Sequence, residues 1–207
     1  MIGGMVVDAP LPSAKPGLRE RKKARTRAQL QATALRLFRE QGYGETTVEQ
    51  IAEAAEVSPT TVYRYFPTKP DLVIYDDLDD RLIAAFRAQP AGVSALQALR
   101  RSMVEVFESL AAGDVALQME REALIRSEPE LRAAMFPEVV RTLDEIAAMI
   151  AERSGRPTDD EAVRALAGAV LGLTIAIWFS PDSKGWQANY LARFNAGMAL
   201  LENGFRL

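Results

Sequence analysis

Residues 58–69, SPTTVYRYFPTK, carry the side chains of this chain that are best suited to bind another molecule. Hydroxyl groups hold phosphate oxygens, and arginine pairs with the O6 and N7 atoms of guanine. The segment therefore points to nucleic acid. The alternative is that the tyrosines are ordinary core aromatics and the arginine a solvent-facing charge. The candidate contacts here are Ser58, Pro59, Thr60, Thr61, Tyr63, Arg64, Tyr65 and Lys69.

Catalytic chemistry has few candidate residues. The sequence has no histidine, the commonest general base and metal ligand, and no cysteine. An acidic run at Asp76, Asp77, Asp79 and Asp80 lacks the glycine turn and spacing of a calcium loop. We therefore predict that the protein is not an enzyme and has no metal site and no cofactor. An all-helical enzyme that uses these carboxylates is the weakest alternative.

Charge is distributed unevenly along the 207 residues. Residues 1–69 have 11 basic and 7 acidic side chains, whereas residues 70–207 have 14 and 21, which together give the net charge of −3. A basic first part and an acidic second part indicate that only the first part faces nucleic acid.

Two short helices joined by a turn position the candidate contacts. Thr47 and Gln50 have capping-box spacing at the start of the first helix. Ser58 is an N-cap for the second helix, and Pro59 follows at the first helical position, where proline is tolerated. This is helix-turn-helix spacing. Its apolar residues recur at helical intervals and predict the buried faces, at Val48, Ile51, Ala52, Ala55, Val62 and Phe66.

The run from residue 34 to residue 73, ALRLFREQGYGETTVEQIAEAAEVSPTTVYRYFPTKPDLV, resembles the N-terminal domain of the TetR family of bacterial repressors. The resemblance implies that Thr60, Thr61 and Arg64 lie toward base edges or nearby phosphates. It further implies phosphate contacts for Tyr63, Tyr65, Lys69 and Thr47. Many family members have glycine where this chain has Glu56, and we expect a more helical turn here.

Two segments precede the helix-turn-helix. Residues 1–18 contain three prolines and three glycines without periodicity, and are interpreted as a disordered tail. Residues 19–27, RERKKARTR, form a basic arm that can reach phosphates or the minor groove. The alternative is a solvated helix start. The DNA contacts assigned to this arm are Arg21, Lys22, Lys23 and Arg25.

The periodicity predicts an all-α fold of about nine helices. A three-helix DNA-binding domain (19–67) precedes a larger helical ligand-binding and dimerisation domain (68–207). In the second domain, we expect a single helix from Thr68 to about Gln89. A later helix, from Pro129 to Arg153, should break or kink at Pro137.

The last two helices, near 158–180 and 187–203, are expected to form a four-helix interface in a homodimer. Small residues let another helix approach closely. The alternative is that both helices only complete the core of one chain. The uncharged run at 165–181 barely reaches the length of a membrane span, so we expect no membrane contact and a cytoplasmic protein. The expected interface residues are Gly168, Gly172, Ile175, Tyr190, Phe194 and Met198.

Adaptable and aromatic side chains on several helices of the acidic part predict a cavity for a small hydrophobic effector. Plain core packing is the alternative for each of them. The segment LIRSEPELRA, residues 124–133, further resembles TetR repressors whose ligands are of the acyl-coenzyme A type. We thus predict a repressor that leaves a roughly palindromic operator when an effector binds; a DNA-binding activator or architectural protein without this switch is the alternative. The expected lining is Phe86, Met103, Phe107, Met119, Met135, Phe136 and Trp178.

Overall fold

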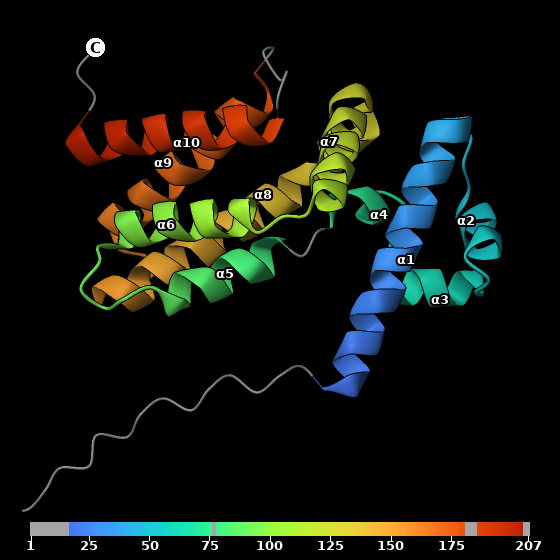
Figure 1. Ribbon diagram of the computed structural model, residues 1–207, viewed down its shortest axis with the longest axis horizontal. Coiled ribbons are helices and arrows are strands. Elements are labelled where there is room, and N and C mark those ends of the chain that lie inside the picture. Colours follow the sequence, from blue (N-terminus) through green and yellow to red (C-terminus); the bar gives the residue numbers. More distant parts are fainter. Residues whose placement is uncertain (1–16, 76–77, 181–185, 205–207) are drawn as a thin grey trace, which may run out of the picture.

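Every regular element in the described part of the chain is a helix. The computed structural model describes residues 17–75, 78–180 and 186–204. These residues confirm the all-α fold (Figure 1). The helices within them are α1 (Leu18–Gln41), α2 (Val48–Ala54), α3 (Pro59–Tyr65), α4 (Asp71–Ile74), α5 (Leu78–Ala88), α6 (Ala95–Glu108), α7 (Ala112–Ser127), α8 (Pro129–Ser154), α9 (Glu161–Trp178) and α10 (Trp186–Asn203).

The first three helices pack around one small core, as the sequence predicts. Leu30, Ala34 and Phe38 of α1 meet Ile51 of α2 and the buried residues of α3. The capping box of α2 is present, because the Gln50 N–H donates to Thr47 Oγ1 at 3.2 Å and the Thr47 N–H donates to Gln50 Oε1 at 2.8 Å. The Ser58 cap of α3 is present as well, at 3.2 Å from the Thr61 N–H.

The basic segment is helical, which corrects the expectation of a separate arm. Helix α1 begins at Leu18 and includes Arg21, Lys22, Lys23 and Arg25 in its first two turns. Arginine, lysine and alanine favour helix, and the segment contains neither glycine nor proline. The predicted disordered tail falls almost wholly on residues 1–16, which lie outside the described residues.

The turn of the helix-turn-helix also differs from expectation. Glu56 adopts a left-handed conformation with φ of +56°, so the turn is not more helical than in chains with glycine there. The neighbouring N–H groups of Glu56 and Val57 donate to the carbonyls of Glu53 and Ala52. These bonds at the end of α2 hold a backbone shape that glycine adopts more easily than glutamate.

The single helix expected from Thr68 to Gln89 is divided into α4 and α5. Tyr75, after α4, is extended, with φ of −64° and ψ of 132°. Leu72 and Val73 of α4 are buried in the core shared by α1–α3, whereas Leu78 and Phe86 of α5 are buried in a second core. The chain therefore passes from the first core to the second at Tyr75. Apolar residues that recur at helical intervals on both sides of Tyr75 pack against two separate cores.

Helices α5 to α10 surround the second core. In Figure 1, α7 stands between α1 and the other helices of this group, and α8 runs from α7 beneath α9 and α10. Helix α8 continues through Pro137, so of the two expected outcomes, a break or a kink, the break does not occur. The carbonyl that Pro137 leaves without an amide partner belongs to Ala133, and both residues are exposed, so water can reach it. Gly155, with φ of +67°, ends α8 as expected.

Candidate DNA-binding and effector sites

Helix α3 presents one polar face outward and one apolar face inward. Val62 and Phe66 are almost fully buried, whereas Thr60 and Arg64 are exposed and Tyr63 is 46% exposed. The Thr61 hydroxyl lies 3.0 Å from Ser58 Oγ, so this pair orders the start of the helix. Because Val62 and Phe66 fix the rotation of α3, its donors are held on one exposed surface.

Tyr65 and Lys69 have structural contacts in addition to the predicted phosphate role. Tyr65 is half-buried beside the N-terminal core, and the Arg64 guanidinium lies 5.4 Å from the centre of its ring. Lys69 Nζ donates to the Tyr43 carbonyl at 2.5 Å and lies 4.1 Å from the centre of the Tyr43 ring. An ammonium group has three donors, so Lys69 can bind the Tyr43 carbonyl, in the turn between α1 and α2, and still reach a phosphate.

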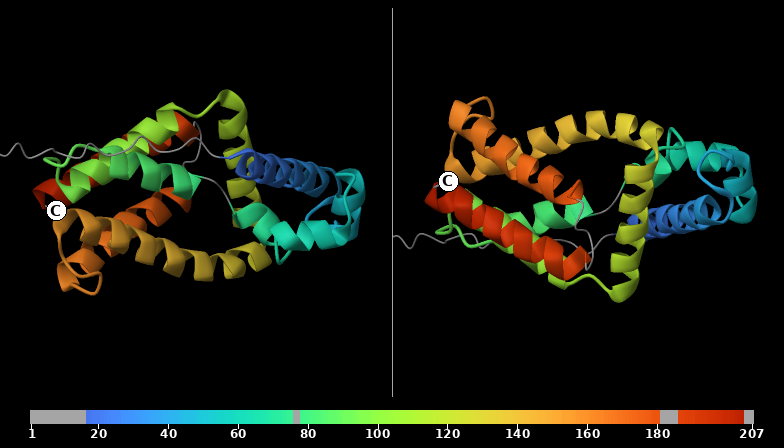
Figure 2. Two further views of the ribbon diagram at one scale, coloured as in Figure 1. Left: turned by 90° about the horizontal axis from the view of Figure 1, so that it is seen from below. Right: turned by 90° about the horizontal axis from the view of Figure 1, so that it is seen from above.

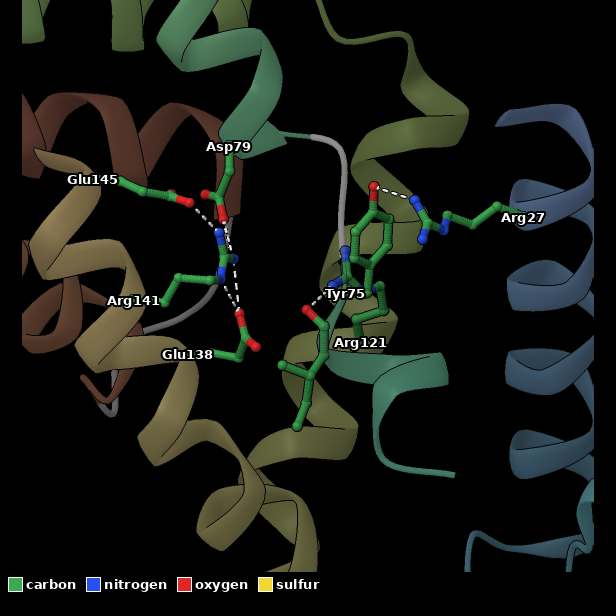
Figure 3. Close-up of polar contacts among 8 residues, drawn as sticks. Arg27, Tyr75, Asp79, Arg121, Glu138, Arg141 and Glu145 are labelled. Carbon is green, nitrogen blue, oxygen red and sulfur yellow. Dashed lines mark hydrogen bonds and ion pairs between the residues drawn. The ribbon is translucent and has the colours of Figure 1, made fainter. Parts of the chain in front are cut away.

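The basic residues of α1 extend the positive surface. Arg21, Lys22, Lys23 and Arg25 are all exposed on the first two turns, and Thr47 is exposed at the start of α2. Arg27 is different, because its guanidinium donates to the Tyr75 hydroxyl at 2.7 Å (Figure 3). It therefore joins α1 to the end of α4.

A cavity of about 150 Å³ lies among α5, α6, α7, α8, α9 and α10. A second cavity of about 120 Å³ adjoins it and shares part of its wall, including Leu82, Met103, Leu171 and Thr174. An apolar cavity of about 150 Å³ accommodates a single aromatic ring. Drug-sized ligands occupy about 300–1,000 Å³, so a larger effector has to move the surrounding helices apart.

Four of the seven predicted lining residues border this cavity, namely Met103, Phe107, Met135 and Trp178. The other three do not. Met119 is 43% and Phe136 71% exposed, because the outer faces of α7 and α8 also carry apolar residues. Phe86 is buried in the core, with the Arg153 guanidinium 5.5 Å from its ring centre. Helical periodicity identifies the apolar face of a helix. It does not distinguish the residues of that face that line a cavity from those that pack in the core.

Polar residues that the sequence analysis did not select form one wall of the cavity. Gln118 and Glu122, one turn apart on α7, are 8% and 4% exposed. Tyr190 is also part of the wall, and its ring stacks on Phe107 with 4.8 Å between centroids. Burial raises the pKa of the Tyr190 hydroxyl, a hydrogen bond with Thr174 lowers it, and the charge of Glu122 raises it. The signal in the sequence was the pair of polar residues four apart among the apolar residues of α7.

A buried arginine joins this wall to α4 (Figure 3). Arg121 Nε donates to the Val73 carbonyl at 2.6 Å, and its Nη2 donates to the Ile74 carbonyl at 2.7 Å. Its Nη1 donates to Gln118 Oε1 at 2.9 Å. Carbonyls at the end of a helix have no intrahelical partner. Arg121 therefore caps α4 from the effector side.

The DNA-binding side caps the same short helix. Gln31 Nε2 of α1 donates to the Tyr75 carbonyl at 2.6 Å and lies 3.4 Å from that of Leu72. A side chain of α1 thus binds the carbonyls of Leu72 and Tyr75, and a side chain of α7 binds those of Val73 and Ile74. Helix α4 is the joint between the helix-turn-helix and the helices that enclose the cavity.

A second arginine binds three carboxylates beside the cavity. Arg141 of α8 is 2.9 Å from Asp79 of α5, and 2.7 and 2.5 Å from Glu138 and Glu145 of its own helix (Figure 3). Asp79, Glu138 and Arg141 line the larger cavity, and Glu145 lines the smaller one. Burial, the largest single effect, lowers the pKa of Arg141. Its hydrogen bonds to Glu138 and Asp79, and the charges of Glu145 and Glu138, together raise this pKa above its ordinary value, so Arg141 stays charged.

The expected interface residues fall into three groups. Tyr190, Phe194 and Met198 of α10 are at most 4% exposed within one chain, so they complete its core and cannot supply an interface, which corrects the prediction. Ile175 is half-buried and lines the cavity. Gly168 and Gly172 are exposed. Small or apolar residues that face outward on these two adjacent helices include Ala165, Gly168, Gly172 and Ala176 of α9, Phe179 directly after it, and Ala192, Ala196 and Leu200 of α10.

Helix α9 is apolar and little buried. By length and composition alone it could cross a membrane, and 17% of its residues are buried within the chain. One side packs on α8 and α10, and at the crossing with α10 a side chain at Gly197 would overlap Leu173. Figure 2, right, views the molecule from the side on which α9 and α10 lie. Small residues on the uncovered side suit close contact with another helix.

Comparisons with known proteins agree with this architecture. Residues 30–75 match the family model for bacterial regulatory proteins of the tetR family, and residues 93–206 match that for the MftR C-terminal domain. The chain is 39% identical to the HTH-type transcriptional regulator TcmR of Streptomyces glaucescens over 153 residues, which cover 70% of this chain and 68% of that protein. It is 24% identical to the putative mycofactocin biosynthesis regulator MftR of Mycobacterium tuberculosis over 161 residues, or 76% and 80% of the two chains.

Solved structures show the same fold. Thermus thermophilus FadR, a TetR family repressor in complex with lauroyl-CoA, has a TM-score of 0.55 and 22% identity over 87% of this chain and 95% of that one. Bacillus subtilis FadR in complex with stearoyl-CoA has a TM-score of 0.54 and 25% identity over 86% and 99%. Together with the match of more than half of the sequence to a family model, these findings assign the chain to the TetR family of helix-turn-helix transcriptional regulators.

Proposed function

We propose that this protein is a homodimeric repressor that binds a roughly palindromic operator through α3 and is released by a small hydrophobic effector. The observation that carries the DNA-binding part is the exposed polar face of α3, which the buried Val62 and Phe66 hold in place. Arg64 and Thr60 read bases, with Thr61 at the edge of the contact. Tyr63, Tyr65, Lys69, Thr47 and the basic residues of α1 hold phosphates. The protein acts in the cytoplasm.

Dimerisation supplies the second α3. Two recognition helices have to lie about 34–36 Å apart to enter successive major grooves on one face of DNA. The uncovered small-residue face of α9 and α10 supports a four-helix interface with a second copy. Sedimentation at micromolar concentration should give a dimer, and Gly168→Arg should give a monomer that loses most of its operator affinity.

The effector acts through the joint at α4. The cavity is smaller than a drug-sized ligand, so binding displaces the wall that contains Gln118. Arg121 follows Gln118 and moves α4, which changes the separation of the two α3 helices in the dimer. An effector that favours the displaced arrangement shifts the population away from DNA.

A mobility-shift assay with DNA from upstream of the gene tests the proposal. Operator affinity should fall steeply with salt, with a slope of about −0.9 per phosphate neutralised. Arg64→Ala should relax sequence preference, whereas Lys69→Ala should weaken all sequences alike. A flat salt dependence would contradict DNA binding. If no hydrophobic compound raises the melting temperature or releases DNA, the protein is an activator or architectural protein without a switch.

A further inference from the structure

The charges around the cavity restrict the chemistry of its occupant. Among the described residues that line the two cavities, four carry negative charge and one carries positive charge. The base is Arg141, and the acids are Asp79, Glu122, Glu138 and Glu145. Glu122 is 4% exposed, and at such depth its charge acts through a lower effective dielectric than at the surface.

The cations near the cavity, within the part of the chain that the structure describes, are already bound. Arg141 donates to three carboxylates within 2.9 Å. Behind the wall, Arg121 donates to two carbonyls and to Gln118, and Arg126 lies 3.4 Å from Glu122. A phosphate or carboxylate that entered the cavity would have to displace these partners, and it would also meet the remaining acidic groups at short range.

We propose that this cavity selects an effector with an apolar body and an uncharged or cationic head group that donates hydrogen bonds, and that the cluster of Arg141 with Asp79, Glu138 and Glu145 excludes anionic head groups. This inference rests on the proposed effector site. The acyl-coenzyme A found in the two FadR structures carries several phosphate charges, so this chain differs in selectivity from those proteins. The apolar wall at Leu82, Met103 and Leu171 binds the body of the ligand.

The polar wall on α7 suits such a head group. Gln118 and Glu122 lie four residues apart on one helix face, and both border the larger cavity. Carboxylate and amide oxygens accept hydrogen bonds from hydroxyl or ammonium groups, and a charged donor strengthens the bond. The head group would therefore contact Gln118, which is the residue that Arg121 links to α4.

A series of ligands with one apolar chain and different head groups tests the inference. Isothermal titration calorimetry on the full chain should be performed with decylammonium, decanol, decanoate and decanoyl-CoA, each below its critical micelle concentration. The cation and the alcohol should bind about tenfold or more tightly than decanoate, and decanoyl-CoA should bind most weakly. Raising the salt concentration should reduce the difference between the cation and the anion.

Glu138→Gln combined with Glu145→Gln provides the sharper test, because it leaves Arg141 with one carboxylate partner. This variant should bind decanoate about tenfold or more tightly than the unmodified chain does, and decylammonium more weakly. Asp144→Asn with Glu152→Gln is the matched control. It also removes two exposed, ion-paired acids of α8, and neither of them lines a cavity.

The outcomes separate the two proposals. Tightest binding of decanoate or decanoyl-CoA by the unmodified chain would overturn the inference and leave the effector site in place. An equal change of preference in the control variant would overturn the role of the Arg141 cluster, because net charge alone would then explain it. Absence of saturable binding by all four ligands would overturn the effector site, and the inference with it.

Discussion

Replacing Arg121 by methionine should loosen the joint at α4. The guanidinium is 4% exposed and makes two short bonds to the carbonyls of Val73 and Ile74. A hydrogen bond to a charged group contributes about 1.5–3 kcal/mol, and a buried carbonyl left without a donor is costly. Methionine retains the apolar stem, so the loss is mainly polar. We expect the free energy of unfolding in urea to fall by about 3–5 kcal/mol.

Arg39→Met is the matched control for this measurement. Arg39 of α1 pairs with Glu120 of α7 at 3.1 Å, and its side chain is 62% exposed. Its replacement should cost less than about 1 kcal/mol. Equal urea midpoints for the two variants would refute the reasoning, because the bonds to α4 would then contribute nothing beyond an ordinary surface contact.

Arg121→Lys separates coupling from folding. The lysine ammonium keeps the charge but cannot reproduce the planar fork that reaches both carbonyls. If the variant folds, operator affinity without effector and effector affinity without DNA can be measured separately. The ratio of operator affinities with and without decylammonium should move toward one, because coupling depends on the link between Gln118 and α4. An unchanged ratio would show that coupling takes another route.

Three further predictions concern the turn at Glu56, the N-cap of α9 and the exposed Phe136. Glu56→Gly should raise the free energy of unfolding by about 0.5–1 kcal/mol. A left-handed residue other than glycine costs about 1–2 kcal/mol, and the larger conformational entropy that glycine loses on folding cancels part of this gain. A lower melting temperature would contradict this. Hydrogen bonds, chiefly from the Val163 N–H, lower the pKa of Asp160 in the folded chain. The carboxylate cap therefore stabilises α9 fully when the pH is above the ordinary carboxyl pKa of about 4. This stabilisation is lost as the pH falls through the lower pKa that Asp160 has in the folded chain. Asp160→Asn should therefore flatten the acid dependence of unfolding, which calorimetry between pH 2 and 6 checks. Phe136→Ser should change the melting temperature and the effector affinity little, because this residue is 71% exposed. A large loss of effector affinity would show that Phe136 contacts the effector after all.

The helix-turn-helix could be predicted from the sequence because local rules decide it. Thr47, Ser58 and Pro59 set the helix starts through groups at most three residues away, and the apolar spacing sets the buried faces. Each prediction required information from a few neighbouring residues only. The left-handed Glu56 was missed because glutamate has no intrinsic preference for that conformation. The bonds at the end of α2 impose it.

The cavity and the interface could be predicted only in part, because both depend on which of two apolar faces a helix turns inward. On α10, the larger residues Tyr190, Phe194 and Met198 face the core, and the small residues Ala192 and Ala196 face outward. A large apolar side chain gains more from complete burial in its own chain. Small outward residues, rather than large ones, therefore mark the surface that a second copy can cover.

The division at Tyr75 shows why the joint lies where it does. A helix that continued from Thr68 to Gln89 would satisfy its own carbonyls and would need neither Arg121 nor Gln31. Instead, the chain ends α4 after one turn, and its last four carbonyls are bound by side chains from α1 and α7. Side-chain bonds of this kind can exchange partners without unfolding a helix. The same four carbonyls therefore supply the connection between the two cores and the place at which their relative orientation can change.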